Sequence, residues 1–478
     1  MIDELAAVDA TEQARMVRDG EVTALELVDA AIARIEALDP QLNAVIHTMF
    51  DKARASAADP DLPDGPFRGV PFLVKDLWQP TAGDPLHSGV KGCKEAGYVH
   101  PTDSNLVTRY RQAGFVMTGR TNTPELGLVA TTEPLAYGPT HNPWNPEYGP
   151  GGSSGGAAAA VASGMVPAAN ASDGGGSIRI PAAMCGLVGL KPSRGRVSNG
   201  PLIDDWGLSC QHVVTRTTRD SAGILDATSI HFHGDGVIAP GPDRPYADLV
   251  EVDPPPLRIG LQTTDTRTAV DADCAAAAEE TARLLETMGH RVEEAHPPSL
   301  DRGDENASNF LSVWATNSSN SLRALGALIG RELGEDDVEP GTWIMATIGD
   351  NTSGPDLAAA WGSMHAFRRE TAQWWAEGWD LLLTPTTSAP PPELGRLVPS
   401  DDDPLQGSRL SAPYANYTSP FNITGQPAIS MPVHLTADGL PVGAQLVADY
   451  ARDDLCLQVS AQLERELGWA ARRAPIHG

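Results

Sequence analysis

The sequence predicts an α/β protein. Short apolar runs bounded by turn residues, such as 66–76 and 380–385, are typical of buried strands. Longer stretches with apolar residues at helical spacing, such as 273–288, lie between them. The chain has 478 residues, of which 41% are apolar and 20% charged, so it can form one large α/β domain or about three domains of average size.

The chain opens with helical patterns. Residues 3–18 are expected to form the first helical segment. Thr23 and Glu26 form a capping-box pattern that begins a second helix, and apolar residues then follow at helical spacing. Pro40 is expected to end this helix, because proline lacks the backbone N–H that a helix needs.

An apolar strand then ends at a charged pair, Lys75 and Asp76. Lysine occurs at only five positions in this chain and is seldom buried unless it is paired or functional. The position alone therefore leaves two readings of Lys75 open. It is either a functional base or one half of a structural ion pair with Asp76 or another carboxylate.

Residues 104–114 predict a helix and 115–125 a strand followed by a loop, while 142–150 are a proline-containing loop. The stretch 149–192 comes next and holds Ser153 and Ser177, each among glycines, with a run of alanines between them that predicts a helix. Glycine lets backbone N–H groups turn toward a ligand. A serine surrounded by such donors suggests acyl transfer, in which a hydroxyl attacks a carbonyl and N–H groups hold the oxyanion.

The remainder of the chain alternates between strand and helix patterns after a proline-rich connection at 240–256. The expected strands are 257–261, 380–385, 421–432 and 443–447, and the expected helices are 273–288 with Gly289 as its cap, 313–333, 356–379 and 453–467.

Composition excludes several classes of protein. The net charge of −28 argues against a nucleic-acid partner, which would need lysine and arginine to neutralise phosphates. No apolar run is long enough for a membrane span, and the acidic N-terminus does not resemble a secretory signal. The cysteines are odd in number and scattered, so we expect reduced, buried thiols in a cytoplasmic protein: Cys93, Cys185, Cys210, Cys274 and Cys456.

Three motifs in the stretch 149–192 resemble the signature of the amidase signature family: G-G-S-S-G-G at 151–156, D-G-G-G-S-I-R-I-P at 173–181 and C-G-L-V-G-L-K-P at 185–192. The resemblance extends over about 20–468 and is weakest in the middle. It implies one large α/β/α domain over 1–478, with a mixed central sheet flanked by helices. Within it we expect a signature core at about 66–200, a variable middle at about 230–375, and C-terminal strands and a helix at about 379–468.

The resemblance also implies a Ser-Ser-Lys triad. Carried over by position, Lys75 of G-V-P-F-L-V-K-D is the base, Ser153 the bridging serine and Ser177 the nucleophile. The lysine can act as a base only when it is neutral, and burial in an apolar strand lowers an amine's pKa in the required direction. The expected activity is hydrolysis of a small-molecule carboxylic amide without a cofactor or metal, and the resemblance is compatible with a homodimer.

Further expectations concern the loop around the nucleophile. The backbone N–H groups from Gly174, Gly175 and Gly176 to Ser177 are expected to form the oxyanion hole. Asp173 and Arg179 are expected to form an ion pair that fixes this loop. By resemblance, the Gly152–Ser153 peptide bond is cis, and Ser154 is either structural or faces the substrate.

The sequence departs from the family pattern at two positions, and two further residues are candidate lining residues. Arg120 stands where the family has a lysine. Ala171 stands where it usually has a glycine, a change that removes no catalytic group. Leu128 and Trp314 are candidates for the pocket wall, although a place in the core is the more common role for such residues. Within the family, the run 91–201 is most similar to amidases grouped with 6-aminohexanoate cyclic-dimer hydrolase, which suggests linear or cyclic aliphatic amides as substrates.

Three other functions fit parts of the sequence. G-G-S-S-G also fits the nucleophile elbow of a Ser-His-Asp esterase, but that elbow needs a strand before the serine, where this chain has a proline-rich loop. An amidotransferase A-type subunit, which releases ammonia for a partner, belongs to the same family. A binding protein that has lost catalysis would not need all three triad positions filled. His231 and His233 could begin a metal site, but no third ligand is indicated.

Overall fold

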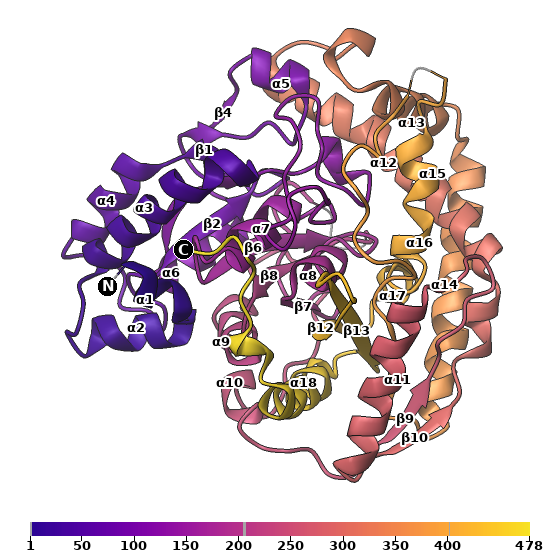
Figure 1. Cartoon of the computed structure of the whole chain (residues 1–478). Coiled ribbons are helices and arrows are strands. Elements are labelled where there is room, and N and C mark those ends of the chain that lie inside the picture. Colours follow the sequence, from indigo (N-terminus) through magenta and orange to yellow (C-terminus); the bar gives the residue numbers. More distant parts are fainter. Residues whose placement is uncertain (1, 204–206, 401) are drawn as a thin grey trace.

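A mixed β-sheet forms the centre of the computed structural model, which describes residues 2–203, 207–400 and 402–478 (Figure 1). Within these residues eleven strands lie side by side in the order β1 (Val45–Thr48), β5 (Val116–Thr121), β2 (Pro71–Lys75), β6 (Ala168–Asp173), β8 (Cys210–Thr215), β7 (Val188–Lys191), β12 (Ala428–Leu435), β13 (Pro441–Ala448), β11 (Leu381–Pro385), β9 (Arg258–Leu261) and β10 (Arg291–Glu294). Strand β2 pairs in parallel with β5 and β6, whereas β6, β8, β7, β12, β13 and β11 pair antiparallel in that order. The predicted mixed sheet is confirmed.

Helices pack on both faces of this sheet, and β2 shows how the sequence divides between them. Phe72 and Val74 lie in the core formed with α6 (Asn105–Gln112), α9 (Thr218–Thr228) and α18 (Asp453–Leu467). Leu73 lies in the opposite core, formed with α3 (Ala24–Leu42), α7 (Gly155–Ala162) and α8 (Arg179–Cys185). Because side chains alternate along a strand, Lys75 points to the same face as Leu73, toward α7.

Helix α7 lies very close to the sheet because its residues are small. Its four consecutive alanines, 157–160, are fully buried. A Cβ on Gly156 would lie 2.5 Å from the backbone nitrogen of Asn122, so only glycine fits there. This close packing brings the N-terminal end of α7, with Ser153 and Ser154, next to the end of β2.

The remaining elements complete the two layers and a helical group at one side of the molecule. Helices α12, α13 and α14 lie on the opposite side from the N-terminal helices (Figure 1). The bounds are α1 (Ile2–Ala7), α2 (Ala10–Arg18), α4 (Phe50–Ala58), α5 (Lys91–Glu95), α10 (Tyr246–Leu249), α11 (Ala272–Thr287), α12 (Gly303–Ile329), α13 (Pro340–Asp350), α14 (Gly354–Ala376), α15 (Gln406–Leu410), α16 (Ala412–Ala415) and α17 (Ser419–Thr424), with a small two-stranded sheet of β3 (Asp84–Pro85) and β4 (Val99–His100).

The prediction that Pro40 ends its helix is wrong, although the capping box at Thr23 and Glu26 is confirmed. Helix α3 continues through Pro40 to Leu42, and Asn43 ends it in the left-handed region at φ 49°. The proline sits in the last turn, where it removes one hydrogen bond without interrupting a longer helix. Asp39 Oδ1 accepts the N–H groups of residues 44 and 45 and so holds the chain where it leaves the helix.

Three other predicted boundaries also differ. The strand expected at 421–432 begins only at Ala428, because the preceding residues form α17, which Gly425 ends at φ 81°. The helix expected at 313–333 begins ten residues earlier and ends at Ile329. The strand expected within 66–76 is confined to β2.

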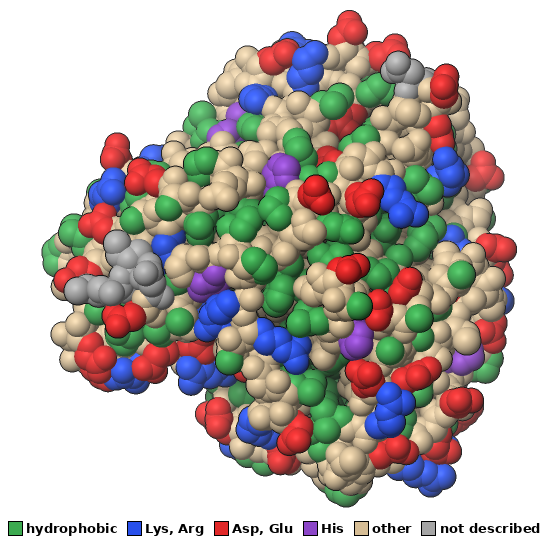
Figure 2. All heavy atoms as spheres, viewed as in Figure 1, with side chains coloured by type: hydrophobic (Ala, Val, Ile, Leu, Met, Phe, Trp, Pro, Cys, Tyr) green, Lys and Arg blue, Asp and Glu red, His purple; other side chains and the backbone are tan. Residues whose placement is uncertain are grey.

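The surface carries mixed charge. On the face drawn in Figure 2, arginine and lysine side chains are interspersed among acidic ones and do not gather into one patch. The five cysteines are buried free thiols, as predicted. In the part of the chain that the structure describes, no helix combines the length and the apolar character that crossing a membrane requires.

Candidate active site

Lys75 lies at the end of β2 with its amine enclosed by three serine hydroxyls. Its Nζ is 2.7 Å from Ser153 Oγ, 2.9 Å from Ser154 Oγ and 2.9 Å from Ser172 Oγ. The side chain is fully buried. Lys75, which the sequence singled out, is therefore in direct contact with the predicted bridging serine, Ser153.

The surroundings of Lys75 favour its neutral form. Burial lowers its pKa well below the usual value, and the negative charge of Asp173 opposes this shift only in part. A neutral amine has a lone pair and can accept a proton from a hydroxyl that points at it, whereas an ammonium can only donate. The site thus provides a base next to Ser153.

The alternative reading, an ion pair between Lys75 and Asp76, is wrong. Asp76 is instead paired with Arg120, whose Nε lies 3.0 Å from Asp76 Oδ1, and both side chains are fully buried. The Arg120 Nη2 group also donates to the backbone carbonyl of Lys75 at 3.1 Å. The arginine that replaces the family's lysine therefore holds the end of β2 and neutralises the neighbouring carboxylate.

Ser153 is held by an unusual backbone turn. The Gly152–Ser153 peptide bond is cis, as the resemblance implies. A Cβ on Gly152 would collide with the backbone of Thr131, so this position accepts only glycine. The neighbouring Ser154 is fully buried, and its Oγ donates to the Ser172 carbonyl at 3.2 Å, which favours the structural reading of Ser154.

Ser177 lies in the loop between β6 and α8 and is slightly exposed, at 9%. Ser153 and Ser177 line the same cavity, which has a volume of about 280 Å³. Among the described residues the structure has no hydrogen bond between these two hydroxyls. Lys75 is thus hydrogen-bonded to Ser153, and Ser177 lies in the wall of the same cavity without a hydrogen bond to Ser153.

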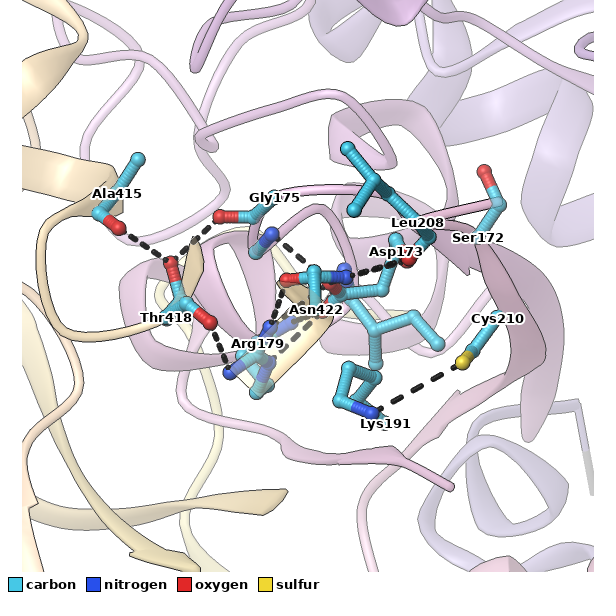
Figure 3. Close-up of polar contacts among 12 residues, drawn as sticks. Ser172, Asp173, Gly175, Arg179, Lys191, Leu208, Cys210, Ala415, Thr418 and Asn422 are labelled. Carbon is cyan, nitrogen blue, oxygen red and sulfur yellow. Dashed lines mark hydrogen bonds and ion pairs between the residues drawn. The ribbon is translucent and has the colours of Figure 1, made fainter. Parts of the chain in front are cut away.

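The predicted ion pair between Asp173 and Arg179 is present and fixes the nucleophile loop (Figure 3). Two guanidinium nitrogens of Arg179 lie 2.9 Å from the two oxygens of Asp173, and both residues are fully buried. Asn422 of α17 also donates to this carboxylate, at 2.9 Å. Burial opposes the negative charge of Asp173, but these partners outweigh it and lower its pKa to about 2.

The three predicted oxyanion-hole glycines differ in what their N–H groups do. The Gly176 N–H donates to Asp173 Oδ1 at 2.8 Å, so it is not free for a ligand and the prediction for Gly176 needs correction. The N–H groups of Gly174, Gly175 and Ser177 have no hydrogen-bond partner within the described residues. Gly176 contributes its backbone conformation instead, at φ 136°, where a Cβ would collide with Thr418 Oγ1.

Two adjoining cavities meet at Ser177. The smaller one, of about 280 Å³, also contains Ser153 and Ser172 in its wall. The larger one, of about 410 Å³, contains neither of them and is bordered by mostly apolar side chains. Leu128 and Trp314 line both cavities, as the sequence suggested they could.

The sequence did not identify Ser172, Thr418 or Asn422 as site residues. Ser172 is the third hydroxyl on the Lys75 amine, and its place beside Asp173 in the signature stretch could have drawn attention to it. Thr418 Oγ1 donates to the Gly175 carbonyl at 2.7 Å, and Asn422 supports Asp173. Nothing in the local sequence shows that α17 returns to the nucleophile loop from more than 200 residues away.

The structure also excludes the Ser-His-Asp arrangement among the described residues. The segment before Ser153 is a loop without a strand, so no nucleophile elbow is formed. No histidine within these residues donates to or accepts from Ser153 or Ser177.

The comparisons agree with this geometry. Residues 26–457 match the family model described as Amidase. The 6-aminohexanoate-cyclic-dimer hydrolases of Pseudomonas sp. (strain NK87) and of Paenarthrobacter ureafaciens are each 44% identical to this chain over 480 residues, which covers 98% of this chain and 96% of each relative. A solved structure of 6-aminohexanoate cyclic dimer hydrolase complexed with substrate superposes with a TM-score of 0.95 at 43% identity, covering 99% of this chain and 100% of that one. A chain with this fold, this site and these relatives belongs to the amidase family, as the three signature motifs indicated.

Proposed function

We propose that this amidase hydrolyses the C–N bond of linear or cyclic aliphatic carboxylic amides through an acyl-enzyme on Ser177. The substrate class follows the names of the relatives, which are cyclic-dimer hydrolases. The contact between the buried Lys75 amine and Ser153, at 2.7 Å, carries the proposal. Ser153 lines the same cavity as Ser177, so it can pass a proton from Ser177 to a neutral Lys75.

In the first half-reaction Lys75 accepts the Ser153 proton while Ser153 accepts the Ser177 proton, and Ser177 Oγ attacks the carbonyl carbon. The N–H groups of Gly174, Gly175 and Ser177 hold the oxyanion. Collapse of the tetrahedral intermediate breaks the C–N bond, and Ser153 returns the proton to the leaving nitrogen. Water then attacks the acyl-enzyme along the same proton path and releases the carboxylic acid and Ser177.

These reaction steps require the Ser153 and Ser177 hydroxyls to approach each other when a substrate fills the cavity. Catalytic hydrogen bonds are commonly long in a free enzyme and shorten in the complex with substrate. A buried ion pair fixes the loop that carries Ser177. We therefore expect the hydrogen bond between Ser153 and Ser177 to form through movement of Ser153 when the substrate binds.

The test is a panel of amides incubated with the purified chain, with the released amine measured. The panel contains the cyclic dimer of 6-aminohexanoate, its linear dimer, simple N-alkyl amides and ammonia-releasing primary amides. We expect hydrolysis of cyclic or linear secondary amides by the chain alone and a Ser177-linked acyl group by mass spectrometry. Turnover with no covalent species at Ser177, together with full activity of Ser177→Ala, would contradict the proposal.

An amidotransferase A-type subunit is the alternative within the family. Such a subunit would release ammonia for a partner and would act on simple amides poorly when alone. Efficient hydrolysis of secondary amides by the isolated chain distinguishes the proposed function from this alternative.

We further propose that the chain forms one domain and works in the cytoplasm. One sheet takes strands from β1 near the N-terminus to β13 near the C-terminus, which supports a single folding unit. Five buried free thiols support a reducing compartment. The homodimer stays a prediction, which the molecular mass of the purified protein in solution tests.

A further inference from the structure

One face of α12 borders both cavities. Its N-terminal half contributes to the larger cavity, and its C-terminal half contributes to the smaller one, with Trp314 in the wall of both. The residues are Ala307, Phe310 and Leu311 on the first side, and Asn317, Ser318, Asn320, Ser321 and Ala324 on the second. They recur every three or four positions, as residues on one face of a helix do.

The chemistry of this face changes at Trp314. Before it the lining side chains are apolar, and after it they are mainly amides and hydroxyls. Ala307 and Ala324 are separated by 17 residues, or about 25 Å along a helix that rises 1.5 Å per residue. The two ends of the helix therefore meet different parts of any molecule that reacts at Ser177.

The position of Ser153 decides which part lies on which side. The leaving nitrogen must receive a proton from Ser153, and Ser153 lines only the smaller cavity. The water that later attacks the acyl-enzyme must lose its proton to the same group, so it enters where the amine has left. The acyl group is bonded to Ser177 throughout and cannot occupy that space, which leaves it the larger cavity.

We infer, on the basis of the proposed function, that α12 sorts the two halves of the amide. The acyl chain extends along Ala307 and Leu311 in the larger cavity, and the leaving amine extends along Asn317 and Ala324 in the smaller one, where the side formed by α12 is mainly polar. Trp314 marks the position of the bond that breaks. The larger cavity thus sets the preference for acyl chain length, and the smaller one sets the preference for the amine.

Two alanines on the same helix give a matched test. Ala307 is half-buried and lines the larger of the two cavities but not the smaller, whereas Ala324 is exposed and lines the smaller but not the larger. Ala307→Leu and Ala324→Leu add the same side chain to each side. Both variants are assayed for kcat/KM with two series, N-butyl amides from acetyl to octanoyl and N-alkyl acetamides from methyl to octyl, after circular dichroism has verified folding.

For the wild type, kcat/KM rises with acyl length by up to about fourfold per buried methylene, which corresponds to about 0.8 kcal/mol. Ala307→Leu lowers kcat/KM for octanoyl by about tenfold, the burial of one to two methylenes, and leaves the amine series unchanged. Ala324→Leu changes how kcat/KM depends on length in the amine series and leaves kcat/KM in the acyl series unchanged. If either variant unfolds, Ala307→Val and Ala324→Val repeat the comparison.

The assignment would be overturned if the changes in kcat/KM were reversed between the two series, were equal for both variants in both series, or were absent in both variants. The amidase activity itself would still stand in each of these cases. A wild-type chain that hydrolyses no member of either series would instead overturn the proposed function, and the assignment with it.

Discussion

Arg120 and Asp76 form an ion pair of 3.0 Å that is fully buried and directly adjacent to Lys75. This pair leaves the Lys75 amine with three hydroxyls as its polar partners among the described residues, and with no carboxylate at salt-bridge distance. An amine without a carboxylate partner loses its proton more easily. The ion pair thus gives Asp76 a partner other than the lysine next to it in the chain.

Arg120→Met is expected to destabilise the fold and to change the pH profile. It leaves Asp76 buried without its partner, which costs about 3–5 kcal/mol in comparable sites. The uncompensated charge also favours the ammonium form of Lys75, so the limb of kcat/KM that rises with pH moves to higher pH. Denaturant unfolding and pH–rate profiles measure the two effects.

Arg323→Met serves as the control for Arg120→Met. Arg323 pairs with Asp350 at the surface, where the side chains are 67% and 49% exposed, and such pairs contribute about 0–1 kcal/mol. A loss of equal size in both variants, or an unchanged pH profile in Arg120→Met, would refute the role given to the buried pair.

Lys75→Met is expected to abolish turnover and to stabilise the protein in a pH-dependent way. The unfolded chain holds a proton on Lys75 up to about pH 10.4, whereas the folded chain gives it up at lower pH. Burying this lysine therefore costs most below its folded pKa, and the cost falls to zero as pH approaches 10. Thermal unfolding at pH 6 and at pH 9.5 checks this, with the larger gain expected at pH 6. A gain independent of pH would mean that folding does not lower the pKa of Lys75.

Ser172→Ala is expected to slow turnover about tenfold or more and to shift the pH profile. Ser172 accepts a hydrogen bond from the Lys75 amine at 2.9 Å, and an acceptor favours the charged form of an amine. Removing it lowers the pKa of Lys75, so the rising limb moves to lower pH while the amine loses one of its positioning contacts. Ser172→Thr should restore both properties. An unshifted profile in Ser172→Ala would assign this residue to packing alone.

Gly176→Ala is expected to inactivate the enzyme, because alanine fits neither φ 136° nor the space beside Thr418 Oγ1. Gly362→Ala is the control. Gly362 lies in α14 with no atom within 4 Å of its absent Cβ, so alanine there should raise stability by about 0.5–1 kcal/mol. Activity assays and thermal unfolding of both variants test this. An active Gly176→Ala enzyme would show that the loop tolerates another backbone conformation.

The sequence predicted those parts of the fold and of the site that depend on residues close together in the chain. The glycines around Ser153 and Ser177, the capping box at Thr23 and the apolar strand before Lys75 each lie within a few residues. A local pattern fixes local backbone geometry, so these elements could be identified before the fold was known.

Contacts between distant segments could not be predicted in this way. Residues 421–424 have strand-like composition but form the end of α17, where Asn422 reaches Asp173. Pro40 stays within α3 because it lies in the last turn, where the loss of one N–H donor costs a single hydrogen bond. The use of the Gly176 N–H by Asp173 depends on how the loop closes, which the glycine pattern does not specify.

The rate at which a phosphonate reagent modifies Ser177, measured against pH, tests the central claim most directly, because it reports nucleophile activation without leaving-group or water steps. The measurement compares the wild type with Lys75→Met, and mass spectrometry verifies the modified residue. We predict a rate that rises with pH through a single ionisation in the wild type, and a rate lower by several orders of magnitude without that ionisation in Lys75→Met. The same ionisation at a similar rate in Lys75→Met would contradict the claim that neutral Lys75 activates Ser177.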